Sequence, residues 1–307
     1  MSPTGSGSRH YAEVRGGGPE HSQWCALTER RSPSRPRFFE GWRKPVGPHF
    51  AAVAQNASHR PNKIQIWVAG TDGLLRAGSC LQLLTDKDWA SLNRIQNSAH
   101  RNSAISARVL LRLGLSRSID RTVAPTEWDF AVTDHQRPIV ASGLPQIHFS
   151  VSHTDQLAVV AISPNLNVGV DVESVDQDVA ENVMAAFYHR DEKRAVGDLS
   201  DLQRTREFIR LWTLKEAYTK MMGVGHSLDF KMIKFMLDPI NLASADGCAA
   251  GAPTLFENFY VSLNHALFHA SLAIEEPSRI AGATEVQIIS LVDSAGEGAA
   301  LVSPSCA

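Results

Sequence analysis

The sequence passes twice through the same order of segments, a strand, then helix, then several strands, and this order constrains the fold most strongly. In the first pass, an alternating β-branched segment at 64–68 precedes a helical pattern at 86–115, which Gly114 is expected to end. Strand patterns follow at 128–133, 146–151 and 157–162. The turn residues between these three segments predict an antiparallel meander.

The second pass begins with a strand pattern at 168–173. A short helix at 179–187 and a long helix at 202–222 come next, and Gly223 is expected to end the long one. Further strands are expected at 230–237, 254–263, 270–275 and 286–292.

Together the two passes predict an α+β fold made of two similar subdomains, residues 62–165 and 166–293. The first 60 residues carry nine Lys and Arg against four Asp and Glu, and they show no sustained hydrophobic period. We expect a disordered or non-domain extension over residues 1–60 and a frayed tail over residues 294–307. The formal charge of −2 is thus a cancellation, because the remaining residues carry 21 basic and 28 acidic groups.

Composition excludes several classes of protein. A near-neutral charge argues against a surface devoted to nucleic acid, and no apolar run approaches the roughly 18 residues that a membrane-spanning helix needs. The four cysteines are scattered without CxxC spacing, which argues against a disulfide framework or a cysteine-based zinc site. We expect a cytoplasmic protein that binds neither membranes nor nucleic acid.

Two carboxylates alternate with valines in the segment VGVDVE at 168–173. On a strand, Asp171 and Glu173 project from one face about 7 Å apart, while the valines point to the other face. Carboxylates held together favour a hard cation such as Mg²⁺, which prefers oxygen ligands. The alternative is a strand whose two acids face solvent.

The long helix carries an aromatic residue, an acid and an amine at four-residue intervals, Trp212, Glu216 and Lys220. Side chains at this spacing share one stripe of a helix. A solvated Glu–Lys pair is the simple explanation and would contribute only about 0.2–0.5 kcal/mol. The tryptophan on the same stripe indicates that this side of the helix is partly buried. Ionisable side chains with shifted pKa values in such positions belong to functional sites more often than solvated pairs do.

A third motif, FSVSH at 149–153, ends an alternating strand with Ser152 and His153. A hydroxyl and an imidazole are suitable hydrogen-bond donors to a phosphate, although both are also ordinary turn residues. A Ser-His-Asp triad is excluded, because there is no GxSxG elbow and adjacent Ser and His cannot form its geometry. Zinc held by histidines is disfavoured because no HExxH pair occurs.

In order and spacing, these motifs resemble those of the 4′-phosphopantetheinyl transferase superfamily, in its two-subdomain Sfp type. The matching segments are RP at 137–138, FSVSH at 149–153, VGVDVE at 168–173 and WTLKEA at 212–217. The resemblance covers roughly residues 62–290. It implies two similar halves related by a pseudo-twofold axis, with the active site in the cleft between them.

The resemblance implies an enzyme that transfers the 4′-phosphopantetheine arm of coenzyme A to a serine of an acyl or peptidyl carrier protein. Members of the superfamily require Mg²⁺ and release adenosine 3′,5′-bisphosphate. The partners expected from this resemblance are an apo carrier protein and coenzyme A, in fatty acid, polyketide or nonribosomal peptide biosynthesis. The carrier protein is not specified, and the enzyme is expected to be a monomer.

The resemblance also assigns roles to the acidic residues and the lysines. Asp171, Glu173 and Glu216 are expected to hold Mg²⁺ against the pyrophosphate, and Glu173 or Glu216 to help deprotonate the carrier serine. Lys220 is expected to be catalytic and to balance charge on a phosphate. Lys215, on another side of the helix, is expected to reach phosphate or carrier.

The expected coenzyme A contacts come from the first half of the chain. Ser152 and His153 are expected to hold phosphates, with His153 on the 3′-phosphate. Arg101 and Arg108 share a broad helix face and resemble the family's phosphate-binding positions, although a solvated basic face is equally consistent with the pattern. Arg137 is expected to contact the nucleotide.

One position departs from the family pattern, because Gln136 replaces the glycine that normally precedes the Arg-Pro pair. Glycine there permits close approach of the backbone, so the contact is expected to loosen or shift. The main alternative function is a non-catalytic module on the same fold that binds a carrier protein or a nucleotide. The presence of all the expected metal and phosphate ligands favours the enzyme.

Overall fold

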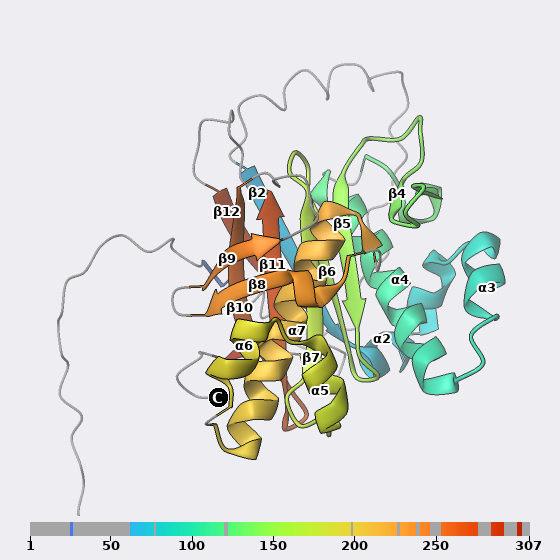
Figure 1. Cartoon of the computed structure of the whole chain (residues 1–307). Helices are drawn as coiled ribbons and strands as arrows, with labels where there is room; N and C mark the ends of the chain where they lie inside the picture. The colour runs from blue at the N-terminus through green and yellow to red at the C-terminus, as the bar shows by residue number, and fades with distance from the viewer. Residues whose placement is uncertain are drawn as a thin grey trace, which may run out of the picture.

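A computed structural model describes residues 25–26, 62–76, 78–119, 122–197, 199–225, 228–237, 240–245, 253–275, 284–291 and 300–302. This part of the chain is mixed α+β, as predicted, with two main sheets lying between two long helices (Figure 1). The predicted terminal extension and tail lie outside the described residues except for two short strands, β1 (Cys25–Ala26) and β13 (Ala300–Val302). Among the described helices, none is long and apolar enough to cross a membrane.

The first sheet has the strand order β1-β12-β2-β6-β5. Its strands besides β1 are β2 (Asn62–Gly70), β5 (His148–His153), β6 (Leu157–Ser163) and β12 (Thr284–Leu291). The pairs β2–β6 and β5–β6 are antiparallel, whereas β12 runs parallel to β2. We had expected this last strand in the second subdomain, 166–293, yet it completes the sheet of the first. The expected boundary therefore does not separate the two sheets.

The helical pattern at 86–115 corresponds to two helices, α3 (Asp86–Leu92) and α4 (Ser98–Ser118). The break follows from capping, because Asn97 accepts a hydrogen bond from the backbone N–H of His100 and starts α4. Gly114 does not end the helix as predicted. It lies inside α4, where an added Cβ would be 2.7 Å from Cδ1 of Ile162, so its role is close packing on the sheet.

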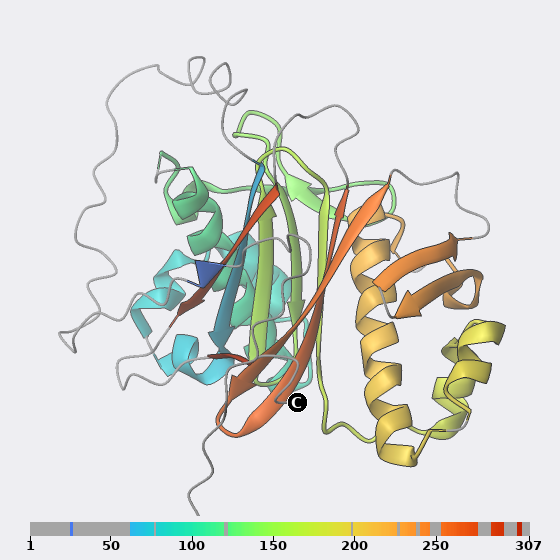
Figure 2. The ribbon, with the colours of Figure 1, turned by 90° about the vertical axis from the view of Figure 1, so that its left-hand side faces the viewer.

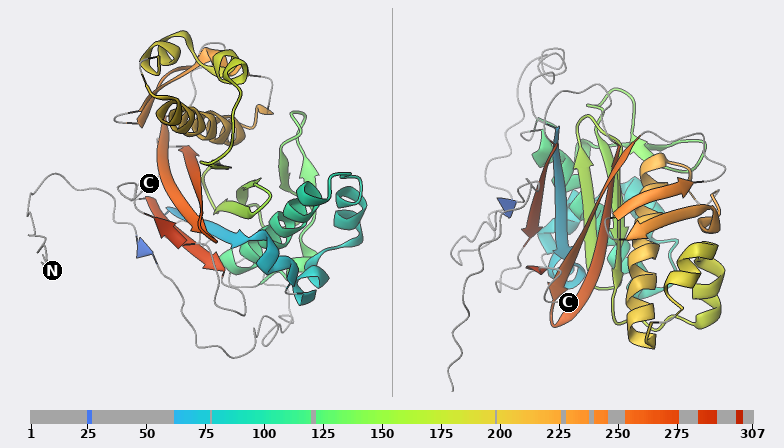
Figure 3. Two further views of the ribbon diagram at one scale, coloured as in Figure 1. Left: turned by 90° about the horizontal axis from the view of Figure 1, so that it is seen from below. Right: turned by 60° about the vertical axis from the view of Figure 1, so that its left-hand side comes forward.

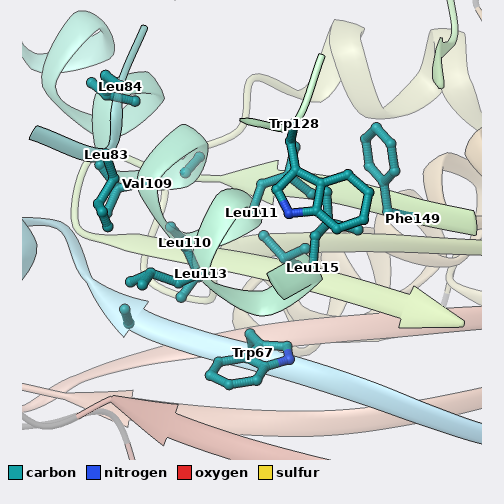
Figure 4. Close-up of a cluster of buried hydrophobic side chains, with 14 of the residues drawn as sticks. Trp67, Leu83, Leu84, Val109, Leu110, Leu111, Leu113, Leu115, Trp128 and Phe149 are labelled. Atoms are coloured by element: carbon teal, nitrogen blue, oxygen red, sulfur yellow. The ribbon is translucent and has the colours of Figure 1, made fainter. Parts of the chain in front are cut away.

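Shorter elements complete the first half. They are α2 (Thr71–Arg76), the 3₁₀ turns η2 (Gly78–Leu83) and η3 (Pro125–Glu127), and a separate hairpin of β3 (Phe130–Val132) and β4 (Pro138–Val140). The predicted meander is thus two hairpins, β3–β4 and β5–β6. The core between α4 and the first sheet includes Trp67, Leu110, Trp128 and Phe149 (Figure 4).

The second sheet has the order β13-β10-β11-β7, with β7 (Val168–Ser174), β10 (Thr254–Leu263) and β11 (Ala266–Glu275) all antiparallel to their neighbours. The long helix α7 (Asp201–Met222) packs across β7 and β11 and ends at Gly223, as predicted, where the φ of 70° is the left-handed conformation that commonly ends a helix. The remaining elements are α5 (Glu181–Phe187), α6 (Arg190–Ala195), η5 (Phe230–Met232) and the hairpin β8 (Ile233–Leu237) and β9 (Ile240–Ala245).

The elements form four layers, α4, first sheet, second sheet and α7, which Figures 2 and 3 show from the side and from below. Three apolar cores fill the three spaces between these layers. The edge strands β5 and β7, one from each sheet, lie in contact. The motifs at 149–153 and 168–173 are therefore neighbours in space.

Candidate functional site

The two carboxylates of β7 face the long helix. Val168, Val170 and Val172 lie in the core between the two sheets, so the strand alternation directs Asp171 and Glu173 to the side of α7. Asp171 is 4% exposed and Glu173 is partly buried. The predicted strand and its two-sided pattern are confirmed.

A glycine brings β7 and α7 unusually close together. A Cβ added to Gly169 would overlap the carbonyl oxygen of Ala217 and lie 2.5 Å from the backbone nitrogen of Met221. Only a residue without a side chain allows this approach. Because Ala217 lies between Glu216 and Lys220 along α7, the contact brings the polar ends of both motifs next to each other.

Asp171 is the centre of the hydrogen-bond network at this contact. Its Oδ1 accepts hydrogen bonds from Lys220 Nζ at 2.6 Å and from the hydroxyl of Ser152 at 2.7 Å. Lys220 Nζ also donates to the carbonyl of Val170 at 3.2 Å. Within the described part of the chain, Oδ2 of Asp171 is buried and has no hydrogen-bond partner. One oxygen of this carboxylate thus accepts two hydrogen bonds, and the other has no donor among the residues that the structure describes.

Glu173 has a strongly perturbed acidity. Burial, with the neighbouring charge of Asp171 second, raises its pKa to about 7, and Glu216 adds to the rise while Lys220 opposes it. Asp171, Glu216 and Lys220 are thus near enough to Glu173 to affect its pKa. Gln177 Nε2 is 3.4 Å from Glu173 Oε2 and supplies a weak hydrogen bond.

The donor set has the chemistry that Mg²⁺ requires. The candidate ligands are the carboxylates of Asp171, Glu173 and Glu216. Oδ2 of Asp171 is a buried acceptor that lacks a donor among the described residues. Across those residues, no three His, Cys, Asp or Glu side chains come close enough together to form a ready-made metal cluster. The residues therefore fit a metal that is bound by few protein ligands together with water and substrate oxygens.

His153 borders the same region from the first half of the molecule. Its Nδ1 is 3.0 Å from the hydroxyl of Ser103 on α4, and the ring of His100 lies 5.3 Å from its own ring. Burial, followed by the charges of His100 and Lys220, lowers the pKa of His153 to about 4. The imidazole is therefore neutral at pH 7, and its partner from α4 restricts its orientation.

The two arginines of α4 lie in different surroundings. Arg108 donates to Asp88 at 2.9 Å and lies over the ring of Phe130, so its charge is held within the first half. Arg112, further along the helix, is buried and also pairs with Asp88. Arg101, by contrast, directly follows His100 in the turn of α4 that reaches His153. Of the two predicted phosphate ligands, Arg101 is thus closer to the site along the helix.

Arg137 connects the first half to the end of α7. Its Nη1 donates to the carbonyl of Met221 at 3.0 Å, and its side chain packs against Gly223. The preceding Gln136 has a φ of 61°, the left-handed region that glycine adopts most easily, which explains the glycine in the family pattern. Arg137 thus lies at the same end of α7 as Lys220.

Lys215 does not lie in this region, contrary to the expectation that it reaches phosphate or carrier. Its side chain is 0% exposed, and Nζ donates to Glu192 of α6 at 2.6 Å and to the carbonyl of Phe230 at 3.0 Å. The ring of Phe187 lies 4.7 Å away. This contact set is structural, because it holds α6 and the turn η5 against α7.

Several residues of the site carried no signal that the sequence analysis used. Ser103 and His100 are two polar residues in a helix, and only the fold brings them to His153. The pairing of β11 with β7 places His269 opposite Glu173 and Ser271 opposite Asp171. The hydroxyl of Thr213 on α7 lies 2.9 Å from Nδ1 of His269 and 2.7 Å from the hydroxyl of Ser271. Ser150 lies within the FSVSH motif, whose pattern assigned it no role.

Comparison with known proteins supports the resemblance found in the sequence. Residues 167–269, which contain β7, α7, β10 and the start of β11, match the model of the 4′-phosphopantetheinyl transferase superfamily. A 4′-phosphopantetheinyl transferase of Paxillus involutus is 30% identical over 148 residues, which cover 42% of this chain and 53% of the relative.

Two other relatives are also named as phosphopantetheinyl transferases. A phosphopantetheinyl transferase of a Thraustochytrium species is 27% identical over 58% of this chain and 67% of its own length. The 4′-phosphopantetheinyl transferase HetI of a Nostoc species is 28% identical over 46% of this chain and 60% of its own length. The chain thus spans about half to two thirds of these curated relatives. Residues 167–269, which supply Asp171, Glu173, Glu216 and Lys220, are thus the part of the chain that is similar to the 4′-phosphopantetheinyl transferase superfamily.

Proposed function

We propose that this chain is a Mg²⁺-dependent 4′-phosphopantetheinyl transferase that modifies a serine of an acyl or peptidyl carrier protein. The observation that carries the proposal is the close contact of Gly169 with Ala217, which brings the acids of β7 and the Glu–Lys pair of α7 into one region. We further propose the two-half Sfp type, with residues 62–165 and 166–293 forming most of the two halves, β12 completing the first half, and the active site between them. The chain would act as a cytoplasmic monomer.

Asp171, Glu173 and Glu216 would hold the metal. When bound, Mg²⁺ supplies positive charge that neutralises the pyrophosphate of coenzyme A. The side chain of Lys220 is 30% exposed, so its ammonium group can exchange the contact with Asp171 for a pyrophosphate oxygen. In this role Lys220 stabilises charge on the departing adenosine 3′,5′-bisphosphate.

The transfer itself is a displacement at phosphorus. The carrier serine oxygen attacks the phosphorus that bears the pantetheine arm, and the bond from that phosphorus to the bridging oxygen breaks. The electron pair of the broken bond leaves with adenosine 3′,5′-bisphosphate. Either Glu173 or Glu216 takes the proton of the serine hydroxyl, directly or through water.

The nucleotide end of coenzyme A would lie toward α4. His153 would donate an N–H to a phosphate oxygen in the tautomer whose Nδ1 accepts from Ser103, and Arg101 would supply the positive charge near it. Arg137, at the end of α7, offers further donors beyond its bond to Met221. Arg108 would contribute only if it left its pair with Asp88.

The direct test is incubation of the protein with apo carrier proteins, coenzyme A and Mg²⁺, followed by intact-mass measurement of each carrier. A gain of one phosphopantetheine on the carrier serine is expected, and Asp171→Ala is expected to abolish it while leaving the circular-dichroism spectrum unchanged. A folded protein that modifies none of a panel of acyl and peptidyl carriers would contradict the proposal. Binding of coenzyme A or carrier without transfer would instead favour the non-catalytic alternative.

A further inference from the structure

The two sheets are connected at their edges by two serine side chains of β5. The hydroxyl of Ser150 accepts a hydrogen bond from the backbone N–H of Val170 at 3.0 Å, and that of Ser152 accepts one from Val172 at 3.3 Å. The two serines are two residues apart on β5, and the two valines are two residues apart on β7. Because the spacings match, side chains on one face of β5 can accept hydrogen bonds from successive backbone N–H groups at the edge of β7.

The two serines differ in what else they contact. Ser152 donates its hydroxyl proton to Oδ1 of Asp171 at 2.7 Å, whereas the contact of Ser150 is with backbone alone. A serine hydroxyl has one proton to donate. The proton of Ser152 is therefore used by Asp171, and this side chain is 7% exposed in a site where it was expected to hold a phosphate.

We propose that Ser152 is a positioning residue for Asp171. The hydroxyl of Ser152 fixes Oδ1, so that Oδ2, which has no partner within the described residues, keeps one direction toward the metal. Lys220, the second donor to Oδ1, is partly exposed and would give up this hydrogen bond when it contacts the substrate. Ser152 would keep its bond to Oδ1, because its hydroxyl is also held by the backbone N–H of Val172. The first half of the chain thus orients a metal ligand that belongs to the second half.

This inference rests on the proposed metal role of Asp171 and deepens it. Hydrogen-bond partners of metal ligands typically change metal affinity by 10–100-fold when they are removed. Ser150 provides a matched control, because it lies on the same strand face and bonds to the same partner strand without touching a carboxylate. A loss at Ser152 that is absent at Ser150 isolates the bond to Asp171.

The experiment measures Mn²⁺ binding to the full chain, by electron paramagnetic resonance of the free ion, without coenzyme A or carrier. Ser152→Ala is expected to weaken Mn²⁺ binding by about 10-fold or more, and Ser150→Ala by less than about 2-fold. Ser152→Thr, which keeps the hydroxyl, is expected to recover most of the affinity. Urea unfolding of the variants shows whether both alanine substitutions leave the fold equally stable.

Three outcomes would overturn the proposal. Equal weakening by both alanine variants would assign the effect to the connection between the sheets. Wild-type Mn²⁺ affinity in Ser152→Ala, with a raised KM for coenzyme A, would show that the hydroxyl acts on the substrate. Absence of Mn²⁺ binding by the wild type would remove the ligand role of Asp171. A wild type that binds Mn²⁺ but modifies no carrier would contradict the proposed function alone, because the serine comparison remains decisive.

Discussion

Lys215 and Lys220 lie five residues apart on α7, and each pairs with a carboxylate at 2.6 Å, yet their surroundings are opposite. Lys215 is fully buried against Glu192, whose own side chain is 3% exposed. Lys220 is 30% exposed and pairs with Asp171 at the border of two sheets. Five residues turn a helix by about 140°, so the two amines emerge on different sides of it.

The difference separates a lysine that holds the fold from one that serves the chemistry. A buried ion pair has no water to replace a lost partner, so removing either charge leaves the other one stranded. An amine with one solvated side can change partners at little cost. The two lysines therefore should separate stability from activity, and the following substitutions test that separation.

The largest effect is expected for Lys215→Ala. It leaves Glu192 charged and buried, and the free energy of unfolding should fall by about 3–5 kcal/mol. Urea denaturation followed by circular dichroism measures this change. The double variant Lys215→Met with Glu192→Gln should recover a large part of the loss, because it removes both charges. Wild-type stability in Lys215→Ala would show that the pair is not structural.

Lys220→Gln should do the reverse. We expect kcat/KM for carrier modification to fall by about 100-fold, because a neutral amide cannot balance charge on the departing phosphate. The unfolding free energy should change by only about 1 kcal/mol, since the amide can still donate to Asp171. A loss of stability as large as that of Lys215→Ala would remove the distinction between the two lysines.

Gly169→Ala tests the contact on which the site depends. The added methyl group would overlap the backbone at Ala217, so α7 must move away from β7, at a cost of about 1–3 kcal/mol. Thermal unfolding and the carrier assay should both show the effect. Gly78→Ala is the control, because an added Cβ at that position meets no atom within 4 Å. Equal behaviour of the two variants would contradict the close contact.

The smallest effect is expected for the pH dependence of stability that arises from His269, whose ring contacts Thr213 of α7. Burial lowers its pKa to about 3, so the unfolded chain binds a proton below pH 6.5 that the folded chain does not. Stability from this group is complete above pH 6.5 and is lost as pH falls toward 3. Between pH 6.5 and 5 the loss should be about 1–2 kcal/mol, by urea denaturation. His269→Asn should flatten that slope, and an unchanged slope would contradict the assignment.

Local patterns predicted most of the elements that form the site. The alternation in VGVDVE gave the strand and its two faces, and the helical pattern before Gly223 gave the bounds of α7 to within one residue. The break between α3 and α4 was missed because Asn93 and Asn97 interrupt the helix without any Gly or Pro. The parallel partner of β2 was missed because pairing between distant strands leaves no local mark.

The residue types at the site were predictable, but their surroundings were not. Lys215 and Lys220 look alike in the sequence, and their difference arises from Glu192, which a separate short helix supplies. In the same way, Ser152 looked like a phosphate donor until the neighbouring sheet placed Asp171 beside it. Roles that depend on the partner of a side chain require the tertiary structure.

The pairing of β12 with β2 has a consequence for synthesis of the chain. Ile66 is paired with Ile288, which the ribosome adds 222 positions later. At a translation rate of about 5–20 residues per second, one edge of β2 remains unpaired for roughly 10–45 s until β12 has been synthesised. During that time the nascent first half presents an open strand edge, which chaperones or a second nascent chain can contact. Synthesis of β12 is therefore the step that allows this edge to close.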